Sequence, residues 1–329
     1  MQTRDWLLSI IIPLYNSQDY IVPCLTSLFT QIAPDIQVII IDDGSTDLSA
    51  QRVKEFLKTY PSACVEFIQQ ANQGVAATRN VGLSKAKGKF ITFLDADDLL
   101  SKNYLSVIRP LLLSDQDDLI DFNYARFENT PPEASENELP QRVAYDFSVQ
   151  GLNSLRPLFI RSMWHLWNRI YRNSLLEGEA FEVGRRYEDV IFTPFQYLKT
   201  QRIAHLENTL YYYRDNQQGI TRNVRMSDIE DMLFAMNKMC AMAQSDTELR
   251  RLAAGMIVNC FNEVKSMSKA VFGYYHYDKQ TRLAIKSAAR LCRGHCKTKK
   301  FWQMRYPEVD TLFSWLRFKA RKSVPEANQ

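Results

Sequence analysis

Hydrophobic and polar positions follow two alternating periods along the first 125 residues. Short, mostly apolar runs predict buried strands, and we place these strands at 8–12, 37–41, 64–68, 90–94 and 119–124. Between them, apolar residues recur at i, i+3, i+4 and i+7, which is typical of amphipathic helices, and we place these helices at 21–29, 53–60, 79–86 and 104–113. This alternation predicts an α/β fold with a mainly parallel central sheet flanked by helices.

Polar clusters follow three of the predicted strands. The clusters are Pro13-Leu14-Tyr15-Asn16, Asp42-Asp43-Gly44-Ser45-Thr46-Asp47 and Asp95-Ala96-Asp97. The carboxyl ends of parallel strands share one edge of a sheet, and ligands of such sheets bind beyond that edge. We therefore expect the three clusters to converge on one binding site.

The Asp95-Ala96-Asp97 triplet has the composition of a cation site. If the backbone stays extended after the strand, the two carboxylates point the same way. Hard oxygen ligands with open coordination positions suit Mg²⁺ or Mn²⁺. The alternative is a loop whose acids are solvated or, as for Asp98, cap the next helix.

Two further segments carry chemistry next to these strands. Gly44 permits a tight turn after Asp42 and Asp43, whose carboxylates can accept hydrogen bonds from a ribose or a base N–H. The segment from Gly74 to Gly82 opens a helix with small residues that allow close approach of a ligand. Arg79 on this helix could reach a diphosphate with its planar fork, although a surface arginine is an equal alternative.

These motifs together resemble glycosyltransferase family 2, whose members have the GT-A fold. The matching segments run from Ser9 to Asn16, Ile41 to Asp47, Gly74 to Gly82 and Phe93 to Asp98, and they lie within the first 125 residues. The resemblance implies a nucleotide-sugar donor, most often a UDP-sugar, and inversion at the anomeric carbon. It also implies a glycan or lipid-linked glycan acceptor of bacterial surface polysaccharide type, such as lipopolysaccharide, O-antigen or capsule.

The resemblance also assigns roles by motif position. Pro13, Tyr15, Asn16 and Asp43 would border the nucleoside. Asp42, Asn72 and Arg79 would lie around the base, ribose or diphosphate. Asp97 would be the firmest ligand of Mn²⁺ or Mg²⁺, and Asp95 and Ala96 would lie nearer the sugar, ribose or metal.

A Glu-Asp pair in the second half resembles the family's catalytic base motif. The resemblance implies that Asp189 is the catalytic base, which accepts the proton of the acceptor hydroxyl. It implies that Glu188 is a neighbour of this base or contacts the acceptor. A pair of acids at a helix N-terminus is the alternative. Trp164, His165 and Trp167 could shape the acceptor site, because aromatic faces stack on sugar rings, and core packing is the equal alternative for each tryptophan.

The chain divides by composition into three parts. Residues 1–225 are expected to form the GT-A domain, with 1–125 as its nucleotide-sugar-binding half and 126–225 as its acceptor-binding half. The polar, proline-rich stretch 129–140 reads as an exposed loop. Residues 226–329 are expected to be mostly helical. Within the end of the catalytic domain, Arg214 or Thr221 could meet the diphosphate.

Charge is unevenly distributed along the chain. Residues 279–322 contain 13 Lys or Arg and two acids, so this segment carries +11 and the rest of the chain −7. Aromatic residues are interleaved with these charges, which suggests an anionic membrane surface as partner, and a solvated helical face is the alternative. No recognised nucleic-acid-binding motif accompanies the charge, so we expect no nucleic-acid partner.

Six scattered cysteines are too few for a disulfide scaffold, and no apolar run approaches the length of a membrane span. A cytoplasmic protein, peripheral on the inner face of the membrane, is therefore expected. Two other functions stay open: a sugar nucleotidyltransferase, and a membrane-associated assembly module. The first requires a Gly-rich, basic loop after the first strand, where Pro13 to Asn16 stand instead.

Overall fold

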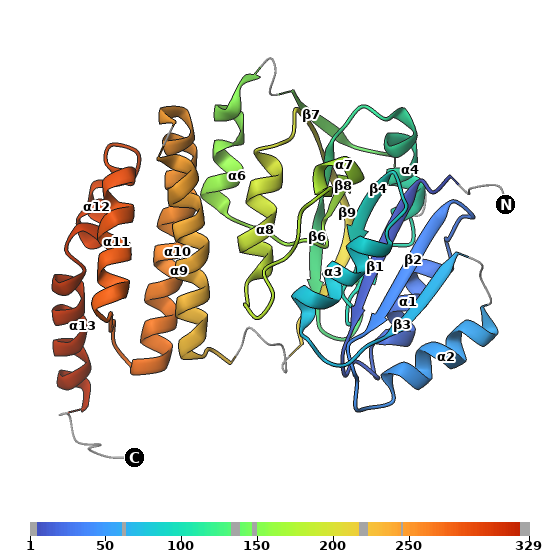
Figure 1. Ribbon diagram of the computed structural model, residues 1–329, viewed down its shortest axis with the longest axis horizontal. Helices are drawn as coiled ribbons and strands as arrows, with labels where there is room; N and C mark the ends of the chain where they lie inside the picture. Colours follow the sequence, from blue (N-terminus) through green and yellow to red (C-terminus); the bar gives the residue numbers. More distant parts are fainter. Residues whose placement is uncertain are drawn as a thin grey trace. The chain divides into compact units, whose positions relative to one another are not determined.

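The computed structural model describes residues 5–60, 64–132, 139–146, 150–216, 223–244 and 246–322. The chain divides by its contacts into two compact units (Figure 1). The first comprises residues 1–150, 165–184 and 192–219, and the second comprises 151–164, 185–191 and 220–329. Segments 151–164 and 185–191 thus group with the helical C-terminal region, while the functional boundary at residue 225 stays a prediction. Thr221 and residues 133–138 of the expected loop lie outside the described residues.

The first unit is built on a mixed sheet, which confirms the predicted fold class. Within the described residues it has nine strands in the order β3-β2-β1-β4-β8-β6-β9-β5, with β7 beside β9. The strands are β1 (Leu8–Leu14), β2 (Ile36–Asp42), β3 (Val65–Gln69), β4 (Phe90–Phe93), β5 (Leu99–Leu100), β6 (Leu119–Phe127), β7 (Arg142–Asp146), β8 (Arg169–Arg172) and β9 (Arg202–Arg214). Strands β1 to β4 pair in parallel, and β8 runs antiparallel to both β4 and β6.

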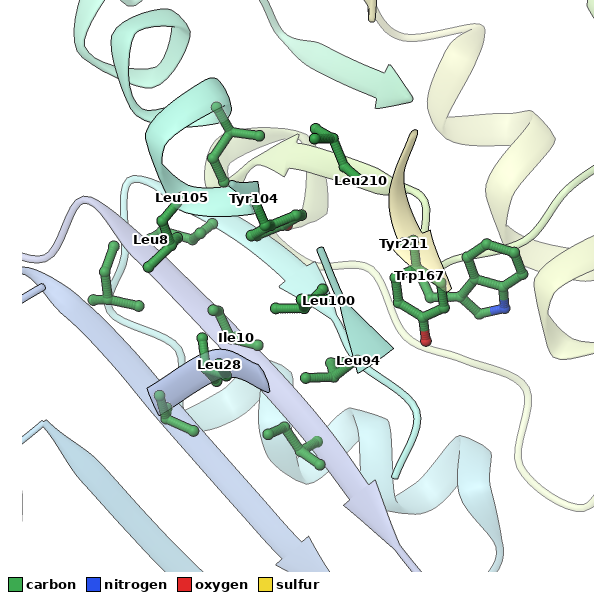
Figure 2. Close-up of a cluster of buried hydrophobic side chains, with 14 of the residues drawn as sticks. Leu8, Ile10, Leu28, Leu94, Leu100, Tyr104, Leu105, Trp167, Leu210 and Tyr211 are labelled. Atoms are coloured by element: carbon green, nitrogen blue, oxygen red, sulfur yellow. The ribbon is translucent and has the colours of Figure 1, made fainter. Parts of the chain in front are cut away.

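Helices flank this sheet and contribute buried side chains to its core. They are α1 (Ile21–Phe29), α2 (Ser49–Thr59), α3 (Val75–Lys85), α4 (Tyr104–Ser114) and the short α7 (Asn173–Leu176). Figure 2 shows Leu8 and Ile10 of β1 in the same buried cluster as Leu28 of α1 and Tyr104 of α4. Each of these side chains is almost fully buried. This packing fixes the position of β1. Because β2 and β4 pair with β1 in register, it also fixes where those two strands end.

The second unit is helical, as expected. It contains the 3-10 turn η1 (Leu152–Leu155), α6 (Arg156–Arg161), α9 (Met226–Ala243), α10 (Thr247–Phe272), α11 (Lys279–Cys292), α12 (Thr298–Arg305) and α13 (Pro307–Lys322). Helix α8 (Glu188–Tyr197) begins in this unit and continues into the first. Met232, Met236 and Met239 are buried, so the methionine stripe of α9 is core. Among the described residues, no helix has both the length and the apolarity needed to cross a bilayer.

Candidate functional site

Three strands of the first unit end at the same edge of the sheet. In the parallel register Leu14 of β1 faces Asp42 of β2, and Ile11 of β1 faces Phe93 of β4. The register continues past the strand ends, because the Asp43 N–H donates to the Leu14 carbonyl at 2.8 Å. The three polar clusters therefore converge at one edge, as the sequence predicts.

Asp43 is held by the loop that follows β3. The side chain is 3 % exposed, and its Oδ1 accepts from Gln70 Nε2 at 2.8 Å and the Gln73 N–H at 2.9 Å. Its Oδ2 accepts from the Gly74 N–H at 2.8 Å. Hydrogen bonds to a carboxylate are stronger than those between neutral groups. Asp43 therefore fixes the loop that leads from β3 into α3.

Gly44 allows the loops after β2 and β3 to approach closely. Its φ is +70°, and a Cβ on it would lie 2.8 Å from the Asn72 backbone nitrogen. Asn72 itself is exposed at this edge. The preceding Asp42 is 2 % exposed and accepts from the Ser45 N–H and from Gln69 Nε2. The sequence predicted a tight turn here, and the structure adds that the neighbouring loop occupies the space a side chain would need.

The segment after β1 is held against the segment after β2. Asn16 has a positive φ of 45°, and its Oδ1 accepts from the Thr46 N–H at 2.8 Å. Pro13 is the sixth residue of β1 and is half-buried, whereas the Tyr15 ring is 49 % exposed. Tyr15 is thus the accessible aromatic face of this edge, suited to stacking on a planar base.

The triplet Asp95-Ala96-Asp97 after β4 forms a turn. The sequence prediction that both carboxylates point the same way assumed an extended backbone here, and that assumption is wrong. The Asp98 N–H donates to the Asp95 carbonyl at 3.1 Å, which closes the turn. Asp95 Oδ1 accepts from Arg79 Nη2 at 2.8 Å, and the guanidinium belongs to a residue that is 4 % exposed. Ala96 between the acids is buried. Arg79 is therefore a buried partner of the triplet, and the surface alternative for it is wrong.

Asp97 combines burial with a neighbouring negative charge. Burial and the Asp95 carboxylate raise its pKa above the ordinary range. Asn216 Nδ2 donates to its Oδ2 over a long 3.3 Å, and Arg214 Nε donates to its carbonyl. A divalent cation would offset the repulsion between the two carboxylates, so this donor set fits Mg²⁺ or Mn²⁺.

Asp98 has a structural role that the sequence did not predict. It is 1 % exposed, and its two carboxylate oxygens accept from the Tyr211 hydroxyl and the Arg214 N–H, each at 2.7 Å. Burial and the Asp97 and Asp95 charges raise its pKa well above the ordinary value. The helix-cap alternative is wrong, because α4 begins only at Tyr104 and Asn103 precedes it. Asp98 instead attaches the acidic turn to β9.

An aromatic stack extends from this attachment. The Trp167 ring stacks on the Tyr211 ring with centroids 4.4 Å apart (Figure 2). It also stacks on His165, with centroids 4.7 Å apart, and on Tyr213, with centroids 5.4 Å apart. Trp167 is 5 % exposed, whereas His165 and Tyr213 are half-buried. Burial and the cations Arg169 and Arg126 lower the pKa of His165 to about 4, so the imidazole is neutral at pH 7. The run Tyr211-Tyr212-Tyr213-Arg214 resembles the end of the family's catalytic domain, but the sequence assigned no role to Tyr211 or Tyr213, although their alternate spacing in a strand indicates that they share a face.

Trp164 groups with the second unit, whereas the residues of this stack group with the first. It is 2 % exposed and packs edge-on against Phe159 of α6, with ring centroids 4.9 Å apart. Trp164 is therefore packed in the core, as the alternative interpretation expects. A contact between Trp164 and an acceptor stays a prediction.

Glu188 and Asp189 occupy the first turn of α8, and both are half-buried. Carboxylates at a helix N-terminus are stabilised by the helix dipole. Asp189 Oδ1 accepts from the Val190 N–H at 2.8 Å. The two acids therefore lie at a helix N-terminus, as the alternative interpretation expects. A catalytic role for Asp189 stays a prediction.

Two buried acids of α9 hold the segment that leads into this turn. Arg186 Nη1 donates to Asp228 Oδ2 at 3.1 Å, and the Arg186 N–H donates to Asp231 Oδ2 at 2.9 Å. Arg185 Nη1 donates to Asp231 Oδ1 at 2.9 Å. The next residue, Tyr187, has a φ of +61°. This clamp of Arg185, Arg186, Asp228 and Asp231 fixes the backbone directly before Glu188.

Comparison with known proteins gives one family and several relatives. The model for glycosyl transferase family 2 matches residues 9–184. GlyA, a glycosyltransferase of Streptococcus pneumoniae, is 27 % identical over 223 residues, which are 66 % of this chain and 32 % of GlyA. TarS of Staphylococcus aureus, a poly(ribitol-phosphate) β-N-acetylglucosaminyltransferase, is 30 % identical over 226 residues, which are 64 % of this chain and 36 % of TarS. The match thus spans about a third of the length of these two relatives.

Solved structures share the fold. The structure of TarS residues 1–349 with UDP-GlcNAc has a TM-score of 0.75 at 21 % identity, and the match covers 96 % of this chain and 91 % of that one. A mannosyltransferase of Pyrobaculum calidifontis, solved with GDP-Man and Mn²⁺, has a TM-score of 0.53 at 14 % identity, with 98 % and 89 % covered. At these identities the similarity shows the GT-A fold.

Proposed function

Because the chain belongs to glycosyl transferase family 2, we propose that it is an inverting glycosyltransferase that moves a sugar from a nucleotide-sugar to a hydroxyl of a bacterial surface glycan. The observation that carries this proposal is the convergence of Asp43, Arg79 and the Asp95–Asp97 turn at the carboxyl edge of β1, β2 and β4. Such an edge is where open α/β sheets bind their ligands.

A UDP-sugar is the donor that we propose for this edge. Tyr15 offers an exposed ring to a base, and Pro13, Asn16 and Asp43 border the same place. Asp42, Asn72 and Arg79 lie around it for the ribose or the diphosphate. TarS, which shares the fold, was solved with UDP-GlcNAc, and this supports UDP-GlcNAc as the first donor to test.

Asp97 and Asp95 would hold Mg²⁺ or Mn²⁺ together with oxygens of the donor's diphosphate. The described residues contain no group of three His, Cys, Asp or Glu that could hold a metal by themselves, so the diphosphate would complete the set. When bound, a divalent cation neutralises charge on the departing diphosphate. The P. calidifontis mannosyltransferase solved with Mn²⁺ supports this ion.

In the proposed reaction Asp189 accepts the proton of the acceptor hydroxyl. The hydroxyl oxygen forms a bond to the anomeric carbon as the bond from that carbon to the diphosphate oxygen breaks, and the nucleoside diphosphate leaves. Glu188 adjoins the acceptor. The half-buried His165, which stacks on the buried Trp167, is the aromatic face on which an acceptor sugar could stack, and Trp164 lies in the second unit with Asp189.

We also propose that the protein works as a cytoplasmic enzyme peripheral to the inner face of the membrane. On α13, Val309, Leu312, Phe313 and Leu316 are all about half-exposed, at the i, i+3, i+4 and i+7 spacing of one helix face. Combined with the +11 charge of residues 279–322, this face suits an anionic lipid surface. Replacing Leu312 and Phe313 by Gln should abolish sedimentation with anionic vesicles, while Leu283→Gln, on an exposed leucine of α11, should not.

The test of the enzymatic proposal is release of nucleoside diphosphate from a panel of nucleotide-sugars with Mn²⁺ or Mg²⁺. We expect UDP release in the presence of a glycan acceptor, and a loss of at least a hundredfold in kcat for Asp189→Asn. Glu55→Gln, an exposed acid of α2, is the matched control and should keep the wild-type rate. Wild-type turnover by Asp189→Asn would reject its role as base, and release of pyrophosphate from a nucleoside triphosphate would instead support a nucleotidyltransferase.

A further inference from the structure

A pocket rich in lysine lies within the second unit, and all of its lining residues belong to that unit. Its volume is about 510 Å³. The lining residues come from α10, α12 and the connection after α10, and they are Asn262, Lys265, Ser266, Lys269, Tyr275, Lys299, Lys300 and Gln303. The lining thus contains four lysines and no carboxylate.

One of the four lysines is neutralised within the protein. Lys265 is 9 % exposed and forms an ion pair with Asp310 of α13. Its Nζ also lies 4.3 Å from the centroid of the Tyr275 ring. Lys265 is therefore a buried cation whose charge is balanced by Asp310, and it lines the pocket together with Tyr275.

None of the other three lysines forms an ion pair with a carboxylate among the described residues. Lys300 Nζ donates a hydrogen bond to Asn262 Oδ1 at 2.6 Å. Because Asn262 is neutral, this hydrogen bond does not neutralise the ammonium charge. Burial and the neighbouring Lys265 lower its pKa. Among the described residues neither Lys269 nor Lys299 has an acidic partner. The pocket therefore holds like charges close together, an arrangement that a bound anion would stabilise.

We propose that this pocket binds a phosphate group of a phosphorylated ligand. A phosphate can accept several hydrogen bonds at once, and lysine ammonium groups bind it as point charges. The Ser266 hydroxyl and the Asn262 amide add neutral donors to the lysines around it. The volume is large enough for the phosphate together with part of the group that it esterifies.

The same chemistry has two sources, a soluble phosphate ester and a lipid headgroup. The half-exposed Trp302 lies three residues after Lys299, so the two side chains are neighbours on the surface of α12. An aromatic side chain next to a lysine suits the interface of a lipid bilayer and thus the headgroup source. The proposal does not depend on the donor site, because every lining residue belongs to the second unit.

The test is titration calorimetry at low salt, with glycerol 3-phosphate as the soluble probe and vesicles of phosphatidylglycerol or phosphatidylcholine as the lipid probes. We expect the wild-type protein to bind glycerol 3-phosphate, phosphatidylglycerol vesicles or both, and to bind more weakly as salt increases. The Lys299→Gln, Lys300→Gln double variant should bind at least tenfold more weakly. Lys269→Gln is a second variant with the same expected direction. Lys279→Gln, at the exposed start of α11, is the matched control and should bind as the wild type does.

The probes separate the two sources. Binding of the soluble ester that the double variant loses supports a phosphate-ester site, and the same loss seen only with phosphatidylglycerol supports a headgroup site. Wild-type binding of neither probe would overturn the proposal. So would equal binding by proteins with and without the double substitution, compared for vesicles in a Leu312→Gln, Phe313→Gln background that lacks the α13 face. Thermal unfolding of each variant distinguishes loss of the binding site from loss of the fold. Lys269 and Lys299 are exposed, whereas Lys300 is half-buried. If the double variant unfolds, Lys269→Gln still tests the site.

Discussion

Replacing Gly44 by Ala tests whether the two loops at the strand ends depend on each other. Gly44 has a φ of +70°, and an added Cβ would lie 2.8 Å from the Asn72 backbone nitrogen and 3.2 Å from the Gln70 carbonyl oxygen. Gly178 is the matched control, because its φ is +74° and a Cβ there meets nothing within 4 Å. The left-handed conformation costs alanine about 1–2 kcal/mol at either position. Crowding against backbone adds about 1–3 kcal/mol at Gly44 alone.

We therefore expect Gly44→Ala to lower the free energy of unfolding by about 2–5 kcal/mol and Gly178→Ala by about 1–2 kcal/mol. Displacement of the loop at Asn72 should also weaken UDP binding for Gly44→Ala, by more than tenfold, and leave it unchanged for Gly178→Ala. Urea unfolding and calorimetric titration of UDP measure the two effects. Equal unfolding free energies for the two variants, or undisturbed UDP binding by Gly44→Ala, would refute the close-approach argument.

Three further predictions concern charged groups. A double-mutant cycle of Arg79→Gln and Asp95→Asn should give a coupling free energy of about 1–3 kcal/mol in urea unfolding, and a coupling near zero would contradict the buried pair. The pKa of His165 is about 4 in the folded protein and about 6.5 when unfolded, so the unfolded chain binds the extra proton and stability falls as pH drops from about 6.5 to 4, by at most about 3 kcal/mol. His165→Phe should flatten this part of the stability profile, and an unchanged slope would reject the assignment. Asp228→Asn should lower the unfolding free energy by about 2–4 kcal/mol because it leaves Arg186 without its buried partner, and wild-type stability would show that the clamp contributes little.

The convergence of the polar clusters could be predicted from sequence because it follows from two local signals. Apolar runs mark buried strands, and in a parallel sheet the residues after each run share an edge. Asp42, Asp43 and Asp97 are therefore found by reading one strand at a time. The small residues from Gly74 onward gave the start of α3 for the same local reason.

Contacts between distant segments could not be predicted in this way. Asp98 pairs with Tyr211, 113 residues away, and nothing near Asp98 distinguishes a buried acceptor from a helix cap. Strand β9 mixes aromatic and polar residues in 13 positions, so its periodicity did not stand out as the apolar runs did. The grouping of 151–164 and 185–191 with the C-terminal helices likewise depends on long-range packing.

Burial decides between the two alternatives for Arg79. The sequence leaves a surface position and a ligand-binding position equally open, because charged side chains are seldom buried without a partner. Asp95 is that partner, and it also raises the pKa of Asp97. Asp95 thus links the buried Arg79 of α3 to the acidic turn after β4, and the roles of this group toward a diphosphate and a metal stay predictions.

We propose that the carboxyl edge of β1, β2 and β4 binds a nucleoside diphosphate together with a divalent cation held by Asp97. Calorimetric titration of UDP with and without Mn²⁺, on wild-type protein and on Asp97→Asn, measures this coupling. We expect Mn²⁺ to tighten UDP binding to the wild-type protein at least tenfold and to have little effect on Asp97→Asn. Equal enhancement by Mn²⁺ in both proteins, or no UDP binding by the wild type, would contradict it.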